Sequence, residues 1–213
     1  MKYIDTEQVV IKSWCNEPEG GAIAQAKNLA NLPFIYKQVC LMPDTHEGYG
    51  MPIGGVIATN GVVIPNAVGV DIGCGMLAQR SNLNQIELPT LKKVLGLIRE
   101  TVPVGFDHHK KAQDESLMPK MDYPALYTEV SRQYTSACKQ LGTLGGGNHF
   151  IEIQKGSDGH IWFMIHSGSR NIGLKVASRY NRMAMALNER WHSVVPKKWE
   201  LAFLPIETEE AKA

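Results

Sequence analysis

The sequence predicts a mixed α/β fold in which antiparallel-rich β-sheet layers are flanked by helices. Short apolar runs that end at strong turn signals predict β-hairpins, one around Asn60-Gly61 and one around residues 155–159. Longer segments carry apolar residues at helical spacing, most clearly 89–101 and 171–190. A chain of 213 residues can bury a substantial core, and we expect residues 1–213 to form a single domain.

The composition excludes several classes of protein. With 22 basic and 21 acidic residues the net charge is +1, so a nucleic-acid partner would have to meet a local basic patch. No apolar run reaches membrane-spanning length, and the N-terminus MKYIDTEQ lacks the core of a signal peptide. The four cysteines include no Cys-x-x-Cys pair, which predicts reduced thiols, a cytoplasmic location and no membrane partner.

The N-terminal elements follow from short patterns. Residues 9–11 predict a strand, and residues 34–41 predict a buried one. Between them, residues 22–32 predict a helix, because their apolar side chains recur on one helical face and Pro33 follows as a stop.

Asp44 and His46 form the first candidate for a functional site. They are two residues apart, so in extended backbone they project to the same side. Such a pair suits metal binding, or a carboxylate that orients a ligating imidazole. An Asp-rich turn with a surface histidine accounts for the same residues, and this interpretation is favoured when the segment is considered by itself.

The next segment leads into a denser site. Residues 53–59 and 62–65 predict a hairpin around Asn60-Gly61. The stretch PNAVGVDIGCGM at 65–76 then predicts a strand with Asp71 near its end, followed by a glycine-rich turn that carries Cys74. A carboxylate and a thiolate held together can bind one borderline metal ion or bridge two. A glycine turn with a buried cysteine is an equally good interpretation of this pattern.

Two helices and a basic loop follow. Residues 76–80 predict a further strand, and residues 89–101 predict the clearest amphipathic helix, with Pro89 in its first turn. The loop at 108–111, His-His-Lys-Lys, predicts a solvated basic segment. Residues 123–141 predict a second long helix.

The segment 142–166 gives the strongest geometric expectation. Glycines 145–147 allow the backbone to approach a ligand closely, although no Gly-Lys-Ser/Thr ends the loop as in a Walker A motif. If the two strands that follow form a hairpin centred between Ser157 and Asp158, His149 lies opposite His166. Two imidazoles on directly opposed strand residues can share a metal. We favour such a site over two unrelated histidines. A register slip of one residue would break the pairing.

Glu152 creates a conflict with that hairpin. In a regular strand, residues three apart face opposite sides, so His149 and Glu152 serve one pocket only if His149 precedes the strand or a bulge intervenes.

The segment after His166 predicts an anion site. Ser167-Gly168-Ser169-Arg170 lies at the start of a helix that runs to about residue 190, where free N–H groups, the helix dipole and a guanidinium combine. A simple N-cap by Ser169 or Asn171 is the alternative. Residues 191–213 predict a polar connection with no element that closes the core.

Four blocks of this sequence, in order, resemble the signatures of the RtcB family of GTP-dependent RNA-splicing ligases. They are MPDTHEGYGMPIGG, IPNAVGVDIGCGM, LGTLGGGNHFIEI and MIHSGSRNIG, and PVGFDHHK at 103–110 resembles an intervening segment. The resemblance, and not the spacing, implies the ligase and an RtcB-like fold.

The resemblance implies a metal site made by Asp71, Cys74, His149 and His166, with the cysteine shared by two manganese ions; zinc is also possible. It implies that GTP is a cofactor and that a histidine carries GMP. The GMP passes to an RNA 3′-phosphate, which the 5′-hydroxyl of a second RNA then attacks. The partners implied are tRNA halves or broken RNA.

Further roles also come from the resemblance alone. Asn148 resembles a residue near the nucleotide phosphate, Glu152 one that contacts guanine, and Arg170 one that contacts RNA phosphate. Asp44 and His46 resemble active-site residues that support the ligands.

The chain is much shorter than the family's chains, so we expect it to be incomplete at its C-terminus. The family's nucleophilic histidine has no match here, since His192 fits no family motif. We therefore expect no catalytic residue in this chain and no ligase activity from the chain on its own. We also expect self-association or a second chain that supplies the missing part. A metal-dependent phosphoester hydrolase and a non-catalytic metal- and RNA-binding fragment remain the alternatives.

Overall fold

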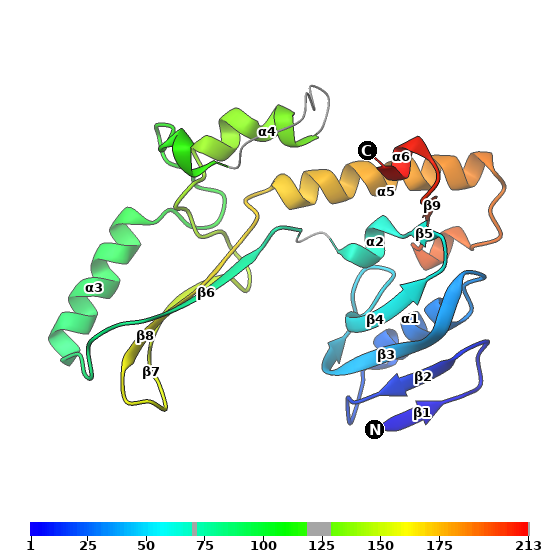
Figure 1. The fold of residues 1–213 in the computed structure, drawn as a ribbon, viewed down its shortest axis with the longest axis horizontal. Coiled ribbons are helices and arrows are strands. Elements are labelled where there is room, and N and C mark those ends of the chain that lie inside the picture. The colour runs from blue at the N-terminus through cyan, green and yellow to red at the C-terminus, as the bar shows by residue number, and fades with distance from the viewer. Residues whose placement is uncertain (70–71, 119–128, 213) are drawn as a thin grey trace. The chain divides into compact units, whose positions relative to one another are not determined.

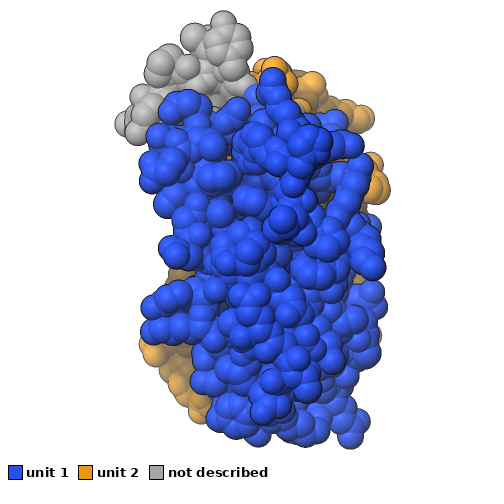
Figure 2. All heavy atoms as spheres, turned by 90° about the vertical axis from the view of Figure 1, so that its right-hand side faces the viewer, with its two compact units in different colours: residues 1–70, 177–213 blue, residues 71–176 orange. Residues whose placement is uncertain are grey.

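The structure is a computed structural model that describes residues 1–69, 72–118 and 129–212. It has the predicted mixed α/β architecture, with three sheets and six α-helices among the described residues (Figure 1). The chain divides into two compact units, which are coloured separately in Figure 2. Unit 1 comprises Met1–Val70 and Ala177–Ala213, and unit 2 comprises Asp71–Val176.

Unit 1 is built on a four-stranded sheet in the order β1-β2-β3-β4. Its strands are β1 (Lys2–Ile4), β2 (Val10–Ser13), β3 (Ile35–His46) and β4 (Ile53–Thr59). Strands β2 and β3 run parallel, so the chain must cross between them, and helix α1 (Gly20–Ala30) makes that crossover. The predicted strands and helix are confirmed here, and β1 is an additional strand.

The core of unit 1 lies between α1 and this sheet. Ile11, Leu29, Val39 and Leu41 are all 0% exposed and belong to one hydrophobic cluster. The apolar face of α1 is thus buried as its spacing predicted.

The predicted hairpin at Asn60-Gly61 is wrong in its pairing. Gly61 does turn the chain, with φ at 72°, but β5 (Val62–Val63) pairs with β9 (Leu204–Pro205) and not with β4. Strand β4 instead pairs with β3. The turn signal was local, whereas the partner of β5 comes from a distant part of the chain.

The segment before Cys74 also differs from the prediction. A strand was expected over residues 68–72, but Val68 ends a single helical turn, α2 (Pro65–Val68), and residues 70–71 lie outside the described residues. Proline at the first helical position favours this turn, because its fixed φ suits a helix start. Strand β6 (Gly75–Arg80) begins only after the glycine turn.

The prediction for residues 191–213 is wrong as well. Leu201 and Leu204 are each 1% exposed, and Leu201 belongs to the main core cluster. The segment also contains the 3₁₀ helix η2 (Lys197–Trp199) and α6 (Glu209–Lys212). Helix α5 (Ile172–Arg190) holds it, since the Asn188 amide donates to the Phe203 carbonyl at 2.6 Å and accepts from its N–H at 3.2 Å.

Unit 2 contains a three-stranded antiparallel sheet in the order β6-β8-β7 (Figure 1). Strands β7 (Phe150–Lys155) and β8 (Ile161–Ser167) form the predicted hairpin, and Met76–Arg80 lies in β6 as expected. Helix α3 (Leu88–Thr101) confirms the amphipathic helix. Helix α4 (Glu129–Cys138) confirms the second half of the helix predicted for 123–141, whose start lies outside the described residues. The 3₁₀ helix η1 (Glu115–Leu117) lies between α3 and α4 in the sequence.

The described helices do not include one that could span a membrane. Among the described residues, no helix combines the length and the apolar character that crossing a membrane would require.

Candidate functional site

The strand order of unit 2 gathers three potential metal ligands at one end of its sheet. Cys74 immediately precedes β6, His149 immediately precedes β7, and His166 is the penultimate residue of β8. Because β6 and β7 both run antiparallel to β8, their starting ends lie beside the end of β8. His149 and His166, which are 75 and 92 positions from Cys74 in the sequence, therefore lie beside it at one end of the sheet.

The three side chains lie close enough to share one ion. The Cys74 Sγ is 3.4 Å from the His149 Nε2, and the two imidazole rings are 5.2 Å apart between centroids and nearly perpendicular, at 83°. One potential ligand atom from each residue falls within 4.8 Å of the other two, and all three side chains are half-buried. Two ligands of a tetrahedral zinc ion lie about 3.5 Å apart, so small side-chain adjustments would let all three residues bind one ion and leave a fourth position for another ligand.

The donor set of the three described residues fits zinc, because a thiolate and two imidazoles are typical zinc ligands. Manganese prefers oxygen donors, which these three residues do not supply. Asp71, the fourth predicted ligand, lies outside the described residues, so its role stays a prediction.

The register prediction for the hairpin was wrong by one residue. His166 lies opposite Phe150, and the last ladder pair before the turn is Lys155 with Ile161. His160 belongs to the turn and not to β8, and its carbonyl accepts a hydrogen bond from the Gly156 N–H at 2.8 Å. The two histidines still meet, because His149 lies just before the strand and is not bound by its alternation.

This arrangement also resolves the conflict over Glu152. Phe150 and Glu152 are two apart in β7, and their partners His166 and Met164 are two apart in β8, so Glu152 shares a sheet face with His166. Glu152 is exposed and accepts a hydrogen bond from the Gln154 amide. Asn148 is exposed next to His149.

Arg170 lies in a strained stretch of backbone directly before α5. Both Arg170 and Asn171 have positive φ, at 54° and 73°, a region that costs non-glycine residues of order 1–3 kcal/mol. The Arg170 Nε donates to the Thr143 Oγ1 at 2.7 Å, and its Nη2 donates to the Asp107 carbonyl at 3.2 Å. Burial lowers the pKa of the Arg170 guanidinium, which nevertheless stays charged at neutral pH.

The predicted N-cap alternative is also present at this helix start. The Ser169 Oγ accepts from the Gly173 N–H at 3.2 Å, so Ser169 satisfies one of the free donors of α5. Arg170 is therefore a fixed cation beside a helix start whose N–H groups are partly satisfied.

Asp44 and His46 belong to unit 1, whereas the three potential ligands belong to unit 2. Both side chains are exposed in β3, and the His46 Nδ1 lies 2.9 Å from the Asp44 carbonyl oxygen. Their predicted supporting role stays a prediction.

Sequence reasoning missed the groups that hold Arg170. The Thr143 hydroxyl and the Asp107 carbonyl come from segments 141–153 and 103–110, and the sequence predicted a role for neither residue. The segment around Val104 and Gly105 pairs with Gly145 by a parallel bridge and a hydrogen bond of 2.8 Å. No local signal in either block announces that pairing.

Comparisons with known proteins agree with the sequence motifs. The family model described as "tRNA-splicing ligase RtcB" matches residues 25–213. The chain is 36% identical over 223 residues to "RNA-splicing ligase RtcB" of Escherichia coli strain K12, covering 97% of this chain and 54% of that protein. It is 32% identical over 239 residues to "tRNA-splicing ligase RtcB" of Thermococcus kodakarensis, covering 89% of this chain and 49% of that protein. The chain therefore spans about half the length of the curated relatives it matches.

Proposed function

The chain belongs to the RtcB family of tRNA-splicing ligases, and from this premise we propose that its residues supply the metal centre of a GTP-dependent RNA ligase. The reaction joins an RNA 3′-phosphate, or 2′,3′-cyclic phosphate, to a 5′-hydroxyl. The observation that carries the proposal is the convergence of Cys74, His149 and His166.

The proposed roles of the ligand residues follow from their donor atoms. Cys74 binds as a thiolate, His149 and His166 bind as neutral imidazoles, and Asp71 adds a carboxylate. Manganese, or zinc, would supply neutralisation of phosphate charge on the attacking and leaving oxygens. A histidine that ligates a metal has no lone pair left for attack on GTP, so neither His149 nor His166 is the proposed GMP carrier.

The proposed roles of the other residues concern positioning. Arg170 binds an RNA phosphate with a guanidinium that Thr143 and Asp107 already orient. Asn148 lies near the nucleotide phosphate, and Glu152 accepts hydrogen bonds from guanine. Asp44 and His46 support the ligands.

We further propose that this chain self-associates or binds a second chain. Unit 2 exposes several large apolar side chains, and exposed apolar area favours association where it is contiguous. They include Leu77 at 56%, Leu97 at 50%, Leu117 at 70% and Phe106 at 100% exposure. Light scattering over a concentration series tests self-association, and a strictly monomeric chain would contradict that part of the proposal.

One incubation separates the candidate functions. The protein is mixed with manganese, GTP and a pair of RNA fragments that bear a 3′-phosphate and a 5′-hydroxyl. Binding of metal, GTP and RNA without turnover is the result expected of a chain that lacks the nucleophilic histidine. Release of the 3′-phosphate would support a metal-dependent hydrolase, and joined RNA would show that this chain carries the whole ligase activity.

A labelling experiment tests the missing nucleophile. With GTP labelled on its α-phosphate, we expect no label to remain on the denatured protein. Acid-labile label that remains, and that is lost in His46→Ala, would show that this chain carries GMP and would contradict the proposal.

A further inference from the structure

The imidazole of His149 lies between two glycines, Gly145 and Gly168. A Cβ atom built on Gly168 would lie 2.5 Å from the His149 Cε1 and 2.9 Å from its Nδ1. A Cβ atom on Gly145 would lie 2.6 Å from the same Nδ1. Real Cβ atoms do not approach other heavy atoms to less than 3.0 Å, so only glycine leaves room for the ring in this place. We call Gly145 and Gly168 the glycine slot.

Backbone hydrogen bonds fix both walls of the glycine slot. The Gly168 N–H donates to the Leu144 carbonyl at 3.0 Å, so the two walls are tied to each other through the residue before Gly145. The Gly145 carbonyl accepts from the Gly105 N–H at 2.8 Å. Gly145 also has φ at 101°, a conformation that residues with a side chain rarely adopt. The slot is therefore held by the backbone and does not depend on side-chain rotamers.

The slot leaves one ring nitrogen facing the other potential ligands. The atoms of His149 that face the glycines most closely are Cε1 and Nδ1, whereas its Nε2 is the nitrogen 3.4 Å from the Cys74 Sγ. We propose that the glycine slot is a positioning device that holds His149 with Nε2 as its metal-binding nitrogen. This inference rests on the proposed metal centre and adds the residues that orient its ligand.

Gly168 offers the cleaner test of the two glycines. Its φ is not in the left-handed region, so alanine can take its backbone conformation, and the three atoms nearest to the added Cβ all belong to His149. At Gly145 an added Cβ would also meet the Arg170 Nη1 at 3.0 Å. Gly96 in α3 is a matched control, because a Cβ there meets nothing within 4 Å.

The experiment measures Zn²⁺ affinity by calorimetric titration of the full chain and its variants. We expect Gly168→Ala to weaken Zn²⁺ binding about tenfold to a hundredfold, the range found when a group that orients a ligand is lost. Gly96→Ala should bind as the parent does. In a His149→Ala background, Gly168→Ala should have no further effect, because the ring that it displaces is gone.

The outcomes separate this inference from the proposed function. If the parent protein binds no Zn²⁺, the metal centre itself is wrong and the inference falls with it. If His149→Ala weakens binding and Gly168→Ala does not, the metal centre stands and the slot is wrong. Equal losses from Gly168→Ala with and without His149 would also overturn the slot.

Two further measurements keep the test decisive. If Gly168→Ala fails to fold, the double variant with His149→Ala should fold; failure of both would overturn the slot. In the parent protein, ¹⁵N chemical shifts of the histidine side chains should show zinc on the Nε2 of His149. Zinc on Nδ1 would contradict the proposed orientation.

Discussion

The two units of this chain differ in what holds them together. Unit 1 has a core cluster in which side chains from α1, β2 and β3 are 0% exposed, joined by Leu201 from the C-terminal segment. Unit 2 carries its three potential metal ligands at the end of a three-stranded sheet. Every residue of β6 is exposed, and no residue of α3 is buried. Fully buried apolar side chains are thus concentrated in unit 1, and we propose that a bound ion adds to the stability of unit 2.

The largest expected effect tests the core of unit 1. Leu29→Ala removes a fully buried side chain and should lower the free energy of unfolding by about 2–5 kcal/mol. The measurement is urea denaturation combined with hydrogen exchange of the β3 amides. Leu97→Ala in α3, where the side chain is 50% exposed, is the control and should change stability by less than about 0.5 kcal/mol. Equal losses would refute the contrast between the units.

The second prediction concerns the bound ion. Zn²⁺ at a hundred times its dissociation constant should stabilise unit 2 by about 2.7 kcal/mol, because the ion binds only the folded site. Amide exchange in β6 and β8 should slow about a hundredfold, and β3 should change much less. His166→Ala should remove the effect, and His108→Ala, in an exposed loop of the same unit, should retain it. Equal protection of β3 and β8 would mean that the ion does not act on unit 2 selectively.

The third prediction concerns Arg170, and the structure revises it. The sequence predicted only an anion site at Arg170, which by itself implies weaker phosphate binding in Arg170→Ala. Because the guanidinium donates to Thr143 and Asp107, Arg170→Ala should also lower stability by about 1–2 kcal/mol. It should weaken RNA binding and reduce the salt slope by about one.

Arg170→Lys is the informative comparison for that variant. Lysine keeps the charge but cannot reproduce the planar fork that reaches both acceptors. Stability should fall as in Arg170→Ala, while part of the salt dependence remains. RNA affinity equal to that of the parent in both variants, at every salt concentration, would exclude a phosphate contact.

The sequence predicted most elements because their signals are local. The helix at 22–32 and the strand at 34–41 carry their own periodicity, and the structure confirms both in α1 and β3. The errors arose where the partner is distant, as in the pairing of β5 with β9. The prediction for residues 191–213 was wrong for the same reason, since two buried leucines in a polar segment form no periodic pattern of apolar residues.

The grouping of three predicted ligands was predictable to a similar degree, while their role as ligands stays a prediction. Cys74, His149 and His166 were named from motifs and an assumed hairpin, and the structure brings them together although the register differs by one. The error of one residue in the register did not separate the two histidines, because His149 lies just before β7. The glycine slot could not be read from the sequence, because a contact between Gly168 and His149 depends on the folded positions of two separate loops.

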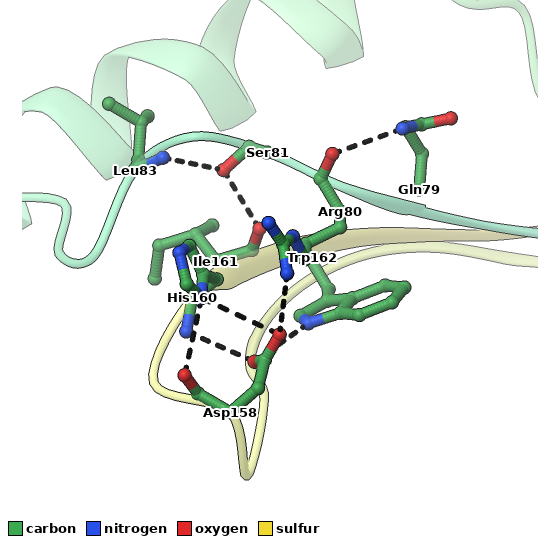
Figure 3. Close-up of polar contacts among 8 residues, drawn as sticks. All are labelled: Gln79, Arg80, Ser81, Leu83, Asp158, His160, Ile161 and Trp162. Carbon is green, nitrogen blue, oxygen red and sulfur yellow. Dashed lines mark hydrogen bonds and ion pairs between the residues drawn. The ribbon is translucent and has the colours of Figure 1, made fainter.

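The smallest expected effect lies at the opposite end of the unit 2 sheet, where polar side chains interact around the β7–β8 turn (Figure 3). The Asp158 Oδ1 accepts from the Trp162 Nε1 and the His160 N–H, both at 3.1 Å. The carboxylate also lies 3.8 Å from the Arg80 guanidinium. The hydrogen bond from Trp162, followed by that from His160 and the nearby positive charges, lowers the pKa of Asp158 below its ordinary value of 3.8.

The sign of the pH dependence follows from that lowered pKa. A carboxylate that is more acidic in the folded state stabilises the hairpin fully above the unfolded pKa of 3.8, and loses this contribution as the pH falls through the lower, folded value. Asp158→Asn should therefore exchange its β7–β8 turn amides faster than the parent at pH 6, and the difference should shrink below pH 4. Asp5→Asn, at an exposed position of unit 1, should show no such difference in the turn. The effect is small because water screens an exposed carboxylate. A difference that persists unchanged at pH 3 would show that shape, and not charge, makes Asp158 useful at this end of the sheet.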